Sequence, residues 1–208
     1  MPSARGVLAR VIFRPGRTFA ALASDPKRFQ TGLRAVIGLG LLYAATSALL
    51  GAGGALVTAP AFLPFSAVNY YFFQMIFALP LFLAAWLLAA AAGRVLARLL
   101  GGRGSWKTTA SGLAFAFVPP CLLIWLPPTA FGGFLLAGMP QAEFMDLLAE
   151  PGWLQIAGWS YHALAVLWMV ALAAASLRAV HGLSRFKAVC GGLIVSAVFL
   201  ASALVLIR

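Results

Sequence analysis

Five long apolar stretches dominate the pattern of the chain, and shorter segments rich in charge, glycine or proline separate them. Each stretch is long enough to cross a bilayer, which takes about 20 residues of helix. Within lipid a helix satisfies its own backbone hydrogen bonds, whereas a single strand does not. The pattern therefore predicts an all-α polytopic membrane protein, a bundle of five transmembrane helices over residues 35–57, 69–93, 108–128, 153–177 and 188–207.

The third stretch, TTASGLAFAFVPPCLLIWLPP, contains Pro119-Pro120 near its middle and Pro127-Pro128 at its end. Proline removes a backbone donor and clashes with the preceding turn, so these pairs predict a kinked or broken helix. The carbonyl groups that lose their donors cannot face lipid. We therefore expect the other helices to wrap around this one. Pro80 predicts a second kink, in the middle of 69–93.

Residues 1–34 form a basic amphipathic segment that precedes the membrane domain of residues 35–208. Apolar residues recur at helical spacing from position 7 and again from position 19, with arginines between them. Pro15 suits the first turn of a second helix, and Asp25-Pro26 suits its end. This pattern predicts two short helices in the membrane interface, with apolar side chains toward the membrane and arginines toward headgroups. The alternative is a cytoplasmic tail that only sets topology.

Small residues recur every four positions on one face of 35–57, at Gly40, Ala44, Ala48 and Ala52. Such a face allows close helix approach, either within the chain or between two copies.

Two of the segments that connect the spans also have distinctive sequences. Residues 58–68 read as an uncharged loop that dips into the outer interface, and residues 129–152 as a loop with a short amphipathic surface helix.

Composition excludes the soluble classes, because 63% of the 208 residues are hydrophobic and only 9% are charged. The net charge of +11 does not indicate nucleic-acid binding, since the cations flank apolar stretches and do not form one stripe. Cys121 and Cys190 are too few and too far apart to form a metal or redox motif.

The cations predict the orientation. All but one of the fifteen lie in 1–34 or in the connections 94–107 and 178–187, which fall on one side of a five-span protein. Three of the four acidic residues lie on the other side, in 129–152. The positive-inside rule places the N-terminus in the cytoplasm and the C-terminus outside. Ten cations are the expected contacts for anionic lipid headgroups: Arg5, Arg10, Arg14, Arg17, Arg94, Arg98, Arg103, Lys107, Arg185 and Lys187.

The chain contains no pattern typical of catalysis. Nucleophile and base do not pair anywhere, and HExxH, CxxC and phosphate-loop motifs are absent. GGRGS at 101–105 is glycine-rich, but it favours a tight turn over a phosphate cradle because no strand precedes it. We therefore expect a protein that is not an enzyme and that has neither a metal site nor a cofactor.

Six residues are candidates for a cavity or a helix break. An ionisable side chain inside a membrane is a functional candidate, but a neutral histidine also hydrogen-bonds neighbouring helices. The two amides likewise suit either ligand contact or helix–helix contact, and the prolines either kink their helices or expose carbonyls to a cavity. The six are Asn69, Gln74, Pro80, Pro119, Pro120 and His162.

Three segments carry a family resemblance: FRPGRTFAAL with SDPKRF, then GGRGSWKTTASGLAFAFVPP, then LRAVHGLSRFKAVCGGL before the last span. In this order they resemble the Yip (Ypt-interacting protein) family of small five-span membrane proteins, in its bacterial branch. Eukaryotic members are linked to membrane traffic and Rab-type GTPases. The acidic-aromatic motifs tied to that role have no counterpart here, so the resemblance implies an integral protein of the bacterial inner membrane.

Two functions fit these observations. The first is a non-enzymatic membrane protein that acts through lipids or through membrane-protein partners, including a second copy of itself. The alternative is a small transporter or permeation pathway, with a cavity beside the proline-containing spans. A dry, packed interface around those prolines favours the first function, and a continuous polar cavity favours the second.

Overall fold

The computed structural model describes residues 4–57, 65–205 and 207, and the side chains from Gly6 onward. Part of the predicted loop 58–68 therefore lies outside the described residues. Over the described ranges the chain is helical without strands: α1 (Ala4–Phe13), α2 (Pro15–Ala23), α3 (Arg28–Ala52), α4 (Tyr70–Leu99), α5 (Trp106–Leu136), α6 (Gln141–Ala149), α7 (Trp153–His181) and α8 (Arg185–Ala203).

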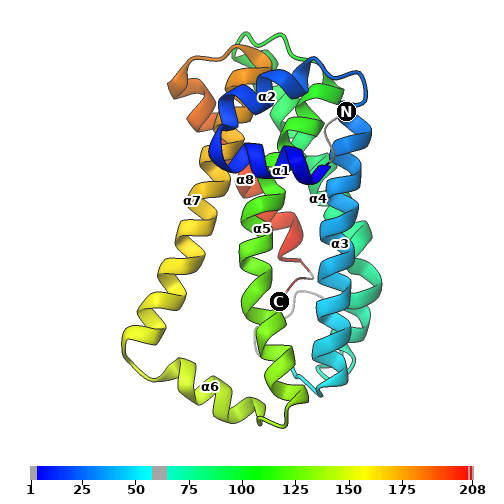
Figure 1. Ribbon diagram of the computed structural model, residues 1–208, viewed down its shortest axis with the longest axis vertical. Helices are drawn as coiled ribbons and strands as arrows, with labels where there is room; N and C mark the ends of the chain where they lie inside the picture. Colours follow the sequence, from blue (N-terminus) through cyan, green and yellow to red (C-terminus); the bar gives the residue numbers. More distant parts are fainter. Residues whose placement is uncertain (1–3, 58–64, 206, 208) are drawn as a thin grey trace.

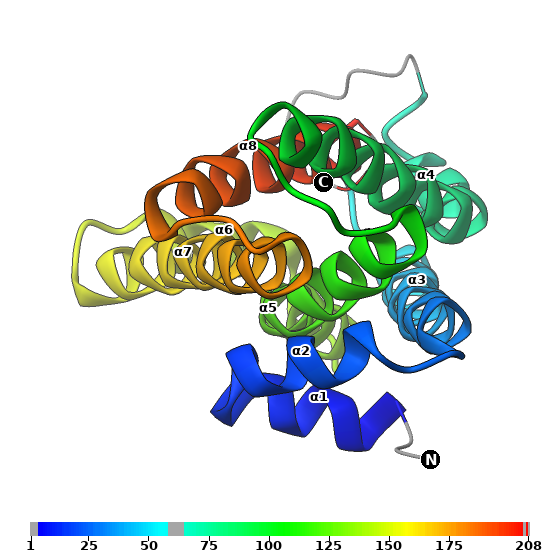
Figure 2. The same ribbon diagram turned by 90° about the horizontal axis from the view of Figure 1, so that it is seen from above.

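The five long helices α3, α4, α5, α7 and α8 run along the long axis of the molecule, with α5 between the others (Figure 1). All five are long and apolar enough to cross a membrane, which confirms the predicted bundle. α1 and α2 lie across the bundle near the end where α3 begins, and α6 lies at the opposite end (Figure 1). The view from above shows that α1 and α2 lie at one side of the bundle (Figure 2).

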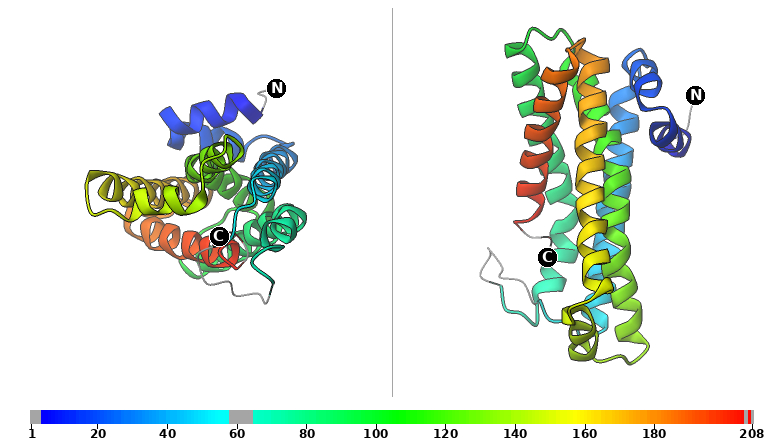
Figure 3. Two further views of the ribbon diagram at one scale, coloured as in Figure 1. Left: turned by 90° about the horizontal axis from the view of Figure 1, so that it is seen from below. Right: turned by 90° about the vertical axis from the view of Figure 1, so that its left-hand side faces the viewer.

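The helices extend beyond the predicted spans at most ends. α3 begins at Arg28 instead of residue 35, α4 continues to Leu99, and α5 continues to Leu136. The apolar run marks the part of a helix that suits lipid, whereas the hydrogen-bonded helix continues into polar sequence until a turn stops it. α3 and α8 instead end before the predicted spans do, at Ala52 and Ala203. α8 has only 19 residues against 31 in α5 and ends well before its neighbours (Figure 3).

α5 is enclosed by the rest of the bundle, as expected. Residues 108–121, which include Pro119 and Pro120, are all buried. The expected break is wrong, however, because α5 is one helix of 31 residues through all four of its prolines, and α4 likewise runs through Pro80. A proline costs a helix one hydrogen bond and local crowding. Close packing surrounds Pro119 and Pro120, whereas Pro80 and Pro127 are exposed.

Side chains of three neighbouring helices donate hydrogen bonds to the backbone of α5. The indole Nε1 of Trp86 on α4 donates to Ala110 O at 2.7 Å, and the hydroxyl of Tyr43 on α3 donates to Cys121 O at 3.1 Å. The hydroxyl of Tyr161 on α7 donates to Leu123 O at 2.8 Å. Leu123 O is the carbonyl four residues before Pro127, so Tyr161 replaces the backbone donor that this proline removes.

The small-residue face of α3 has two parts. A Cβ atom at Gly40 would lie 2.9 Å from the Cα of Leu79, so the absence of a side chain permits the close approach of α3 and α4. Ser47, on the same side, is buried and accepts a hydrogen bond from the amide of Gln74 at 3.0 Å. Ala48 and Ala52 are exposed. The packing of this face is thus intramolecular at Gly40, while its far end stays uncovered.

The N-terminal helices are present, but their apolar faces do not turn toward the membrane. Val11 and Phe19 are fully buried and belong to the core that α1 and α2 share with α5 and α7. Of the large apolar side chains described in α1 and α2, only Ile12 and Phe13 at the end of α1 are exposed, at 45% and 82%. The apolar stripe that contains Val11 and Phe19 therefore packs the hairpin of α1 and α2 against the bundle. Sequence periodicity identifies the buried face of a helix without identifying what buries it.

We expect Gly40→Ala to destabilise the bundle by about 1–3 kcal/mol, since the added methyl group meets backbone and α3 must move away from α4. Gly38→Ala on the same helix is the matched control, because nothing lies within 4 Å of a Cβ atom there. Thermal unfolding of both variants in detergent tests this. Equal stability of the two variants contradicts the close approach.

Tyr161→Phe removes the hydroxyl that bonds Leu123 O, and we expect a loss of about 1 kcal/mol. Pro127→Ala restores a backbone donor to the same carbonyl. In that background Tyr161→Phe should cost clearly less, and a double-mutant cycle on unfolding free energies measures the difference. Strict additivity of the two substitutions is the result that argues against this compensation.

Candidate functional site

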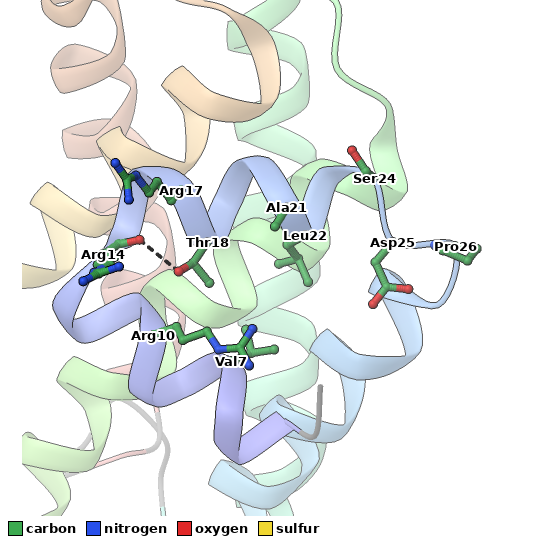
Figure 4. A pocket seen from close by; sticks show the side chains of 10 residues that line it. All are labelled: Val7, Arg10, Arg14, Arg17, Thr18, Ala21, Leu22, Ser24, Asp25 and Pro26. Atoms are coloured by element: carbon green, nitrogen blue, oxygen red, sulfur yellow. Dashed lines mark hydrogen bonds between the residues drawn. The ribbon is translucent and has the colours of Figure 1, made fainter. Parts of the chain in front are cut away.

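A cavity of about 600 Å³ lies between α1, α2 and the turn into α3 (Figure 4). α1 and α2 form its two walls, and the turn after α2 closes one end. Its lining combines apolar side chains with three arginines and one aspartate: Val7, Arg10, Arg14, Arg17, Thr18, Ala21, Leu22, Ser24, Asp25 and Pro26.

Local sequence produces this cavity. Arg14 leaves the helical conformation, at φ −142° and ψ 59°, as expected for a residue that precedes proline, and the chain turns from α1 into α2. The hydroxyl of Thr18 donates to Arg14 O at 2.9 Å, which holds the turn. After α2, Asp25 Oδ1 accepts the Lys27 backbone N–H at 2.8 Å and shapes the turn into α3.

The arginines of the cavity have no anionic partner in the described part of the chain. The guanidinium groups of Arg10, Arg14 and Arg17 form no hydrogen bond or ion pair there, and the one acidic side chain in the lining is Asp25. Guanidinium groups bind phosphate and carboxylate with paired, charge-assisted hydrogen bonds. This arrangement therefore suits an anionic ligand.

The other predicted headgroup contacts gather at the same end of the molecule, where α4 and α7 end and α5 and α8 begin (Figure 1). Lys187 donates to Leu100 O at 3.0 Å and ties α8 to α4. Arg94 is half-buried, whereas the others whose side chains are described are exposed: Arg98, Arg103, Lys107, Arg185 and Lys187. The side chain of Arg5 lies outside the described part. At the opposite end, three exposed acidic residues on or directly after α6 line a second cavity of about 540 Å³: Glu143, Asp146 and Glu150.

The six cavity candidates separate into two groups. Gln74, Pro119 and Pro120 are buried in helix packing. The rest are exposed, and they lie on or next to α4 and α7: Asn69, Pro80 and His162. The imidazole Nδ1 of His162 lies 2.8 Å from Gly158 O of its own helix. Within the described ranges, no group of three His, Cys, Asp or Glu side chains is placed to hold a metal ion.

His181 is a polar centre that sequence reasoning missed. It is buried at the end of α7, where its Nδ1 accepts the Gly104 backbone N–H at 3.1 Å and its Nε2 lies 2.9 Å from Thr109 Oγ1. The Thr109 hydroxyl donates to Ser105 O, so Nε2 carries the proton and the ring is neutral. The glycine-rich segment is thus a turn packed on α7, since a Cβ atom at Gly104 would lie 2.7 Å from Val180 O.

The two histidines of α7 provide a matched test. His181→Leu leaves the Gly104 N–H without its acceptor and removes the donor to Thr109 Oγ1, and we expect it to lower the free energy of unfolding by about 1–3 kcal/mol. His162→Leu should change stability little, because the exposed ring bonds only its own helix. Equal effects of the two substitutions in detergent unfolding contradict the structural role of His181.

Comparison with known proteins agrees with the architecture. No curated protein and no solved structure matches the chain. The family model of the Yip1 domain matches residues 9–206, which include all five long helices and most of the α1–α2 hairpin. This match covers nearly the whole sequence, and the chain therefore belongs to the Yip1 domain family of membrane proteins.

Proposed function

We propose that this protein is a non-enzymatic component of the bacterial cytoplasmic membrane that acts by binding anionic lipids at its cytoplasmic face. The observation that carries the proposal is the separation of charge along the bundle. Arginines and lysines gather where α1 and α2 dock, and three exposed acidic side chains lie on or directly after α6 at the other end. Membrane proteins keep basic segments in the cytoplasm, where the leaflet is anionic.

The packing around α5 supports lipid binding over a permeation pathway. The buried run 108–121 contains the adjacent prolines that a pathway would use. The Tyr43 hydroxyl bonds Cys121 O beside them, and the Trp86 indole bonds Ala110 O nearer the start of α5. Gln74, the buried amide of α4, bonds Ser47 of α3. These groups hold helices together, which is the role expected of a packed, dry interface.

The orientation can be tested by cysteine labelling. In a background with Cys121→Ala and Cys190→Ala, an impermeant maleimide should label Glu143→Cys in intact cells, because α6 faces outward in this proposal. Arg103→Cys should react only after the cells are permeabilised. Labelling with the opposite pattern overturns the proposed cytoplasmic face.

Lipid preference can be tested on protein purified in mild detergent. We expect the copurifying lipids to be enriched in anionic species relative to the bulk membrane, with the enrichment reduced by high salt, which screens charge at exposed sites. Mass spectrometry of extracted lipids measures both quantities. A copurifying composition equal to that of the bulk membrane contradicts the proposal.

A further inference from the structure

We propose that the cavity between α1 and α2 binds one phospholipid whose headgroup carries two negative charges. This inference rests on the proposed function and makes it specific, because it distinguishes one built site from a diffuse attraction between a basic surface and an anionic leaflet.

Charge sets the class of headgroup. Arg10, Arg14 and Arg17 line the cavity, and Asp25 contributes the opposing carboxylate, which leaves a net charge of +2 on the lining. A headgroup with one negative charge compensates half of this, whereas a phosphomonoester or a pair of phosphodiesters compensates it fully. Each phosphate can also accept paired hydrogen bonds from a guanidinium group.

The size of the cavity favours a whole headgroup over a single ion. A volume of about 600 Å³ lies within the range of small-molecule sites, roughly 300–1,000 Å³. The lining is amphipathic as well, with Val7, Ala21 and Leu22 beside the arginines. These side chains suit the glycerol and the first methylene groups of a lipid, which an inorganic anion lacks.

The position of the hairpin selects a lipid as the occupant. α1 and α2 lie across the bundle and project from its side, so the cavity is beside the transmembrane helices and not above them (Figures 2 and 3). Directly before Arg14, the side chains of Ile12 and Phe13 are 45% and 82% exposed. Exposed apolar groups next to guanidinium groups match the boundary between acyl chains and headgroups.

The walls of the cavity are fixed before any ligand binds. Val11 anchors α1 and Phe19 anchors α2, and both side chains are fully buried. The Thr18 hydroxyl holds the turn between the two helices through Arg14 O. Binding therefore orders three arginine side chains without having to fold the hairpin, and a preformed site keeps more of its interaction energy as affinity.

Native mass spectrometry of the full chain in detergent tests the proposal with defined lipids. Phosphatidic acid and cardiolipin supply the two charges in two chemistries, phosphatidylglycerol supplies one, and inorganic phosphate supplies the charge without a lipid. We expect one phosphatidic acid or cardiolipin per chain, bound about tenfold more tightly than phosphatidylglycerol, and no retention of inorganic phosphate at the same concentration. Equal affinity for phosphatidylglycerol, or equal retention of inorganic phosphate, overturns the proposal.

Three variants locate the site. Arg17→Gln should weaken binding about tenfold, because it removes one guanidinium–phosphate contact. Arg98→Gln is the control, an exposed cation at the same end but on α4 and outside the cavity. Asp25→Asn should tighten binding, since it removes the opposing charge but keeps an oxygen to accept the Lys27 N–H. A misfolded hairpin cannot tighten binding, so this variant distinguishes an effect on the binding site from an effect on folding.

Two results overturn the inference alone: equal weakening by Arg17→Gln and Arg98→Gln, or no gain from Asp25→Asn. In either case, copurifying lipids that are still enriched in anionic species leave the proposed function standing. If the copurifying lipids are not enriched in anionic species, the proposed function is wrong as well. The two measurements therefore distinguish failure of the lipid site from failure of the proposed function.

Discussion

The need to satisfy every backbone carbonyl inside a bilayer organises this structure. α5 carries four prolines, and each deprives a carbonyl one turn earlier of its donor. A helix of this kind is stable in a membrane only where protein surrounds it. Accordingly, residues 108–121 are buried throughout, and the Tyr161 hydroxyl bonds Leu123 O, one of the carbonyls that lose a donor. Tyr43 and Trp86 bond other carbonyls of α5. The other long helices are arranged around this requirement.

The central helix α5 also positions the basic end of the molecule. α1 and α2 pack on α5 and α7 through the apolar stripe that contains Val11 and Phe19, and the start of α3 is tied to α5 by the Ser111 hydroxyl, which donates to Arg28 O at 2.7 Å. The hairpin is therefore part of the bundle. Its arginines border a cavity of fixed shape, and this difference from a flexible basic tail underlies the proposed recognition of a single lipid.

Hydropathy and the prolines predicted the five helices and the central place of α5, because both depend on local sequence and on the bilayer as solvent. The docking of the N-terminal stripe could not be predicted, since periodicity carries no information on the partner surface. The contact of His181 with Gly104 and Thr109 joins residues more than 70 positions apart. A glycine-rich turn and a histidine after an apolar run were visible separately, but no local pattern pairs them. The continuity of α5 through its prolines likewise depends on tertiary packing.

Amide hydrogen exchange of the full chain in detergent, resolved along the sequence, tests the enclosed position of α5 most directly. The structure predicts the slowest exchange in residues 108–121 and faster exchange in residues 153–164 of α7, where every side chain is exposed or half-buried. The exchange of 108–121 should stay slow despite the missing proline hydrogen bonds, because neighbouring helices exclude water. Exchange of 108–121 as fast as that of 153–164 would contradict a packed centre and the account built on it.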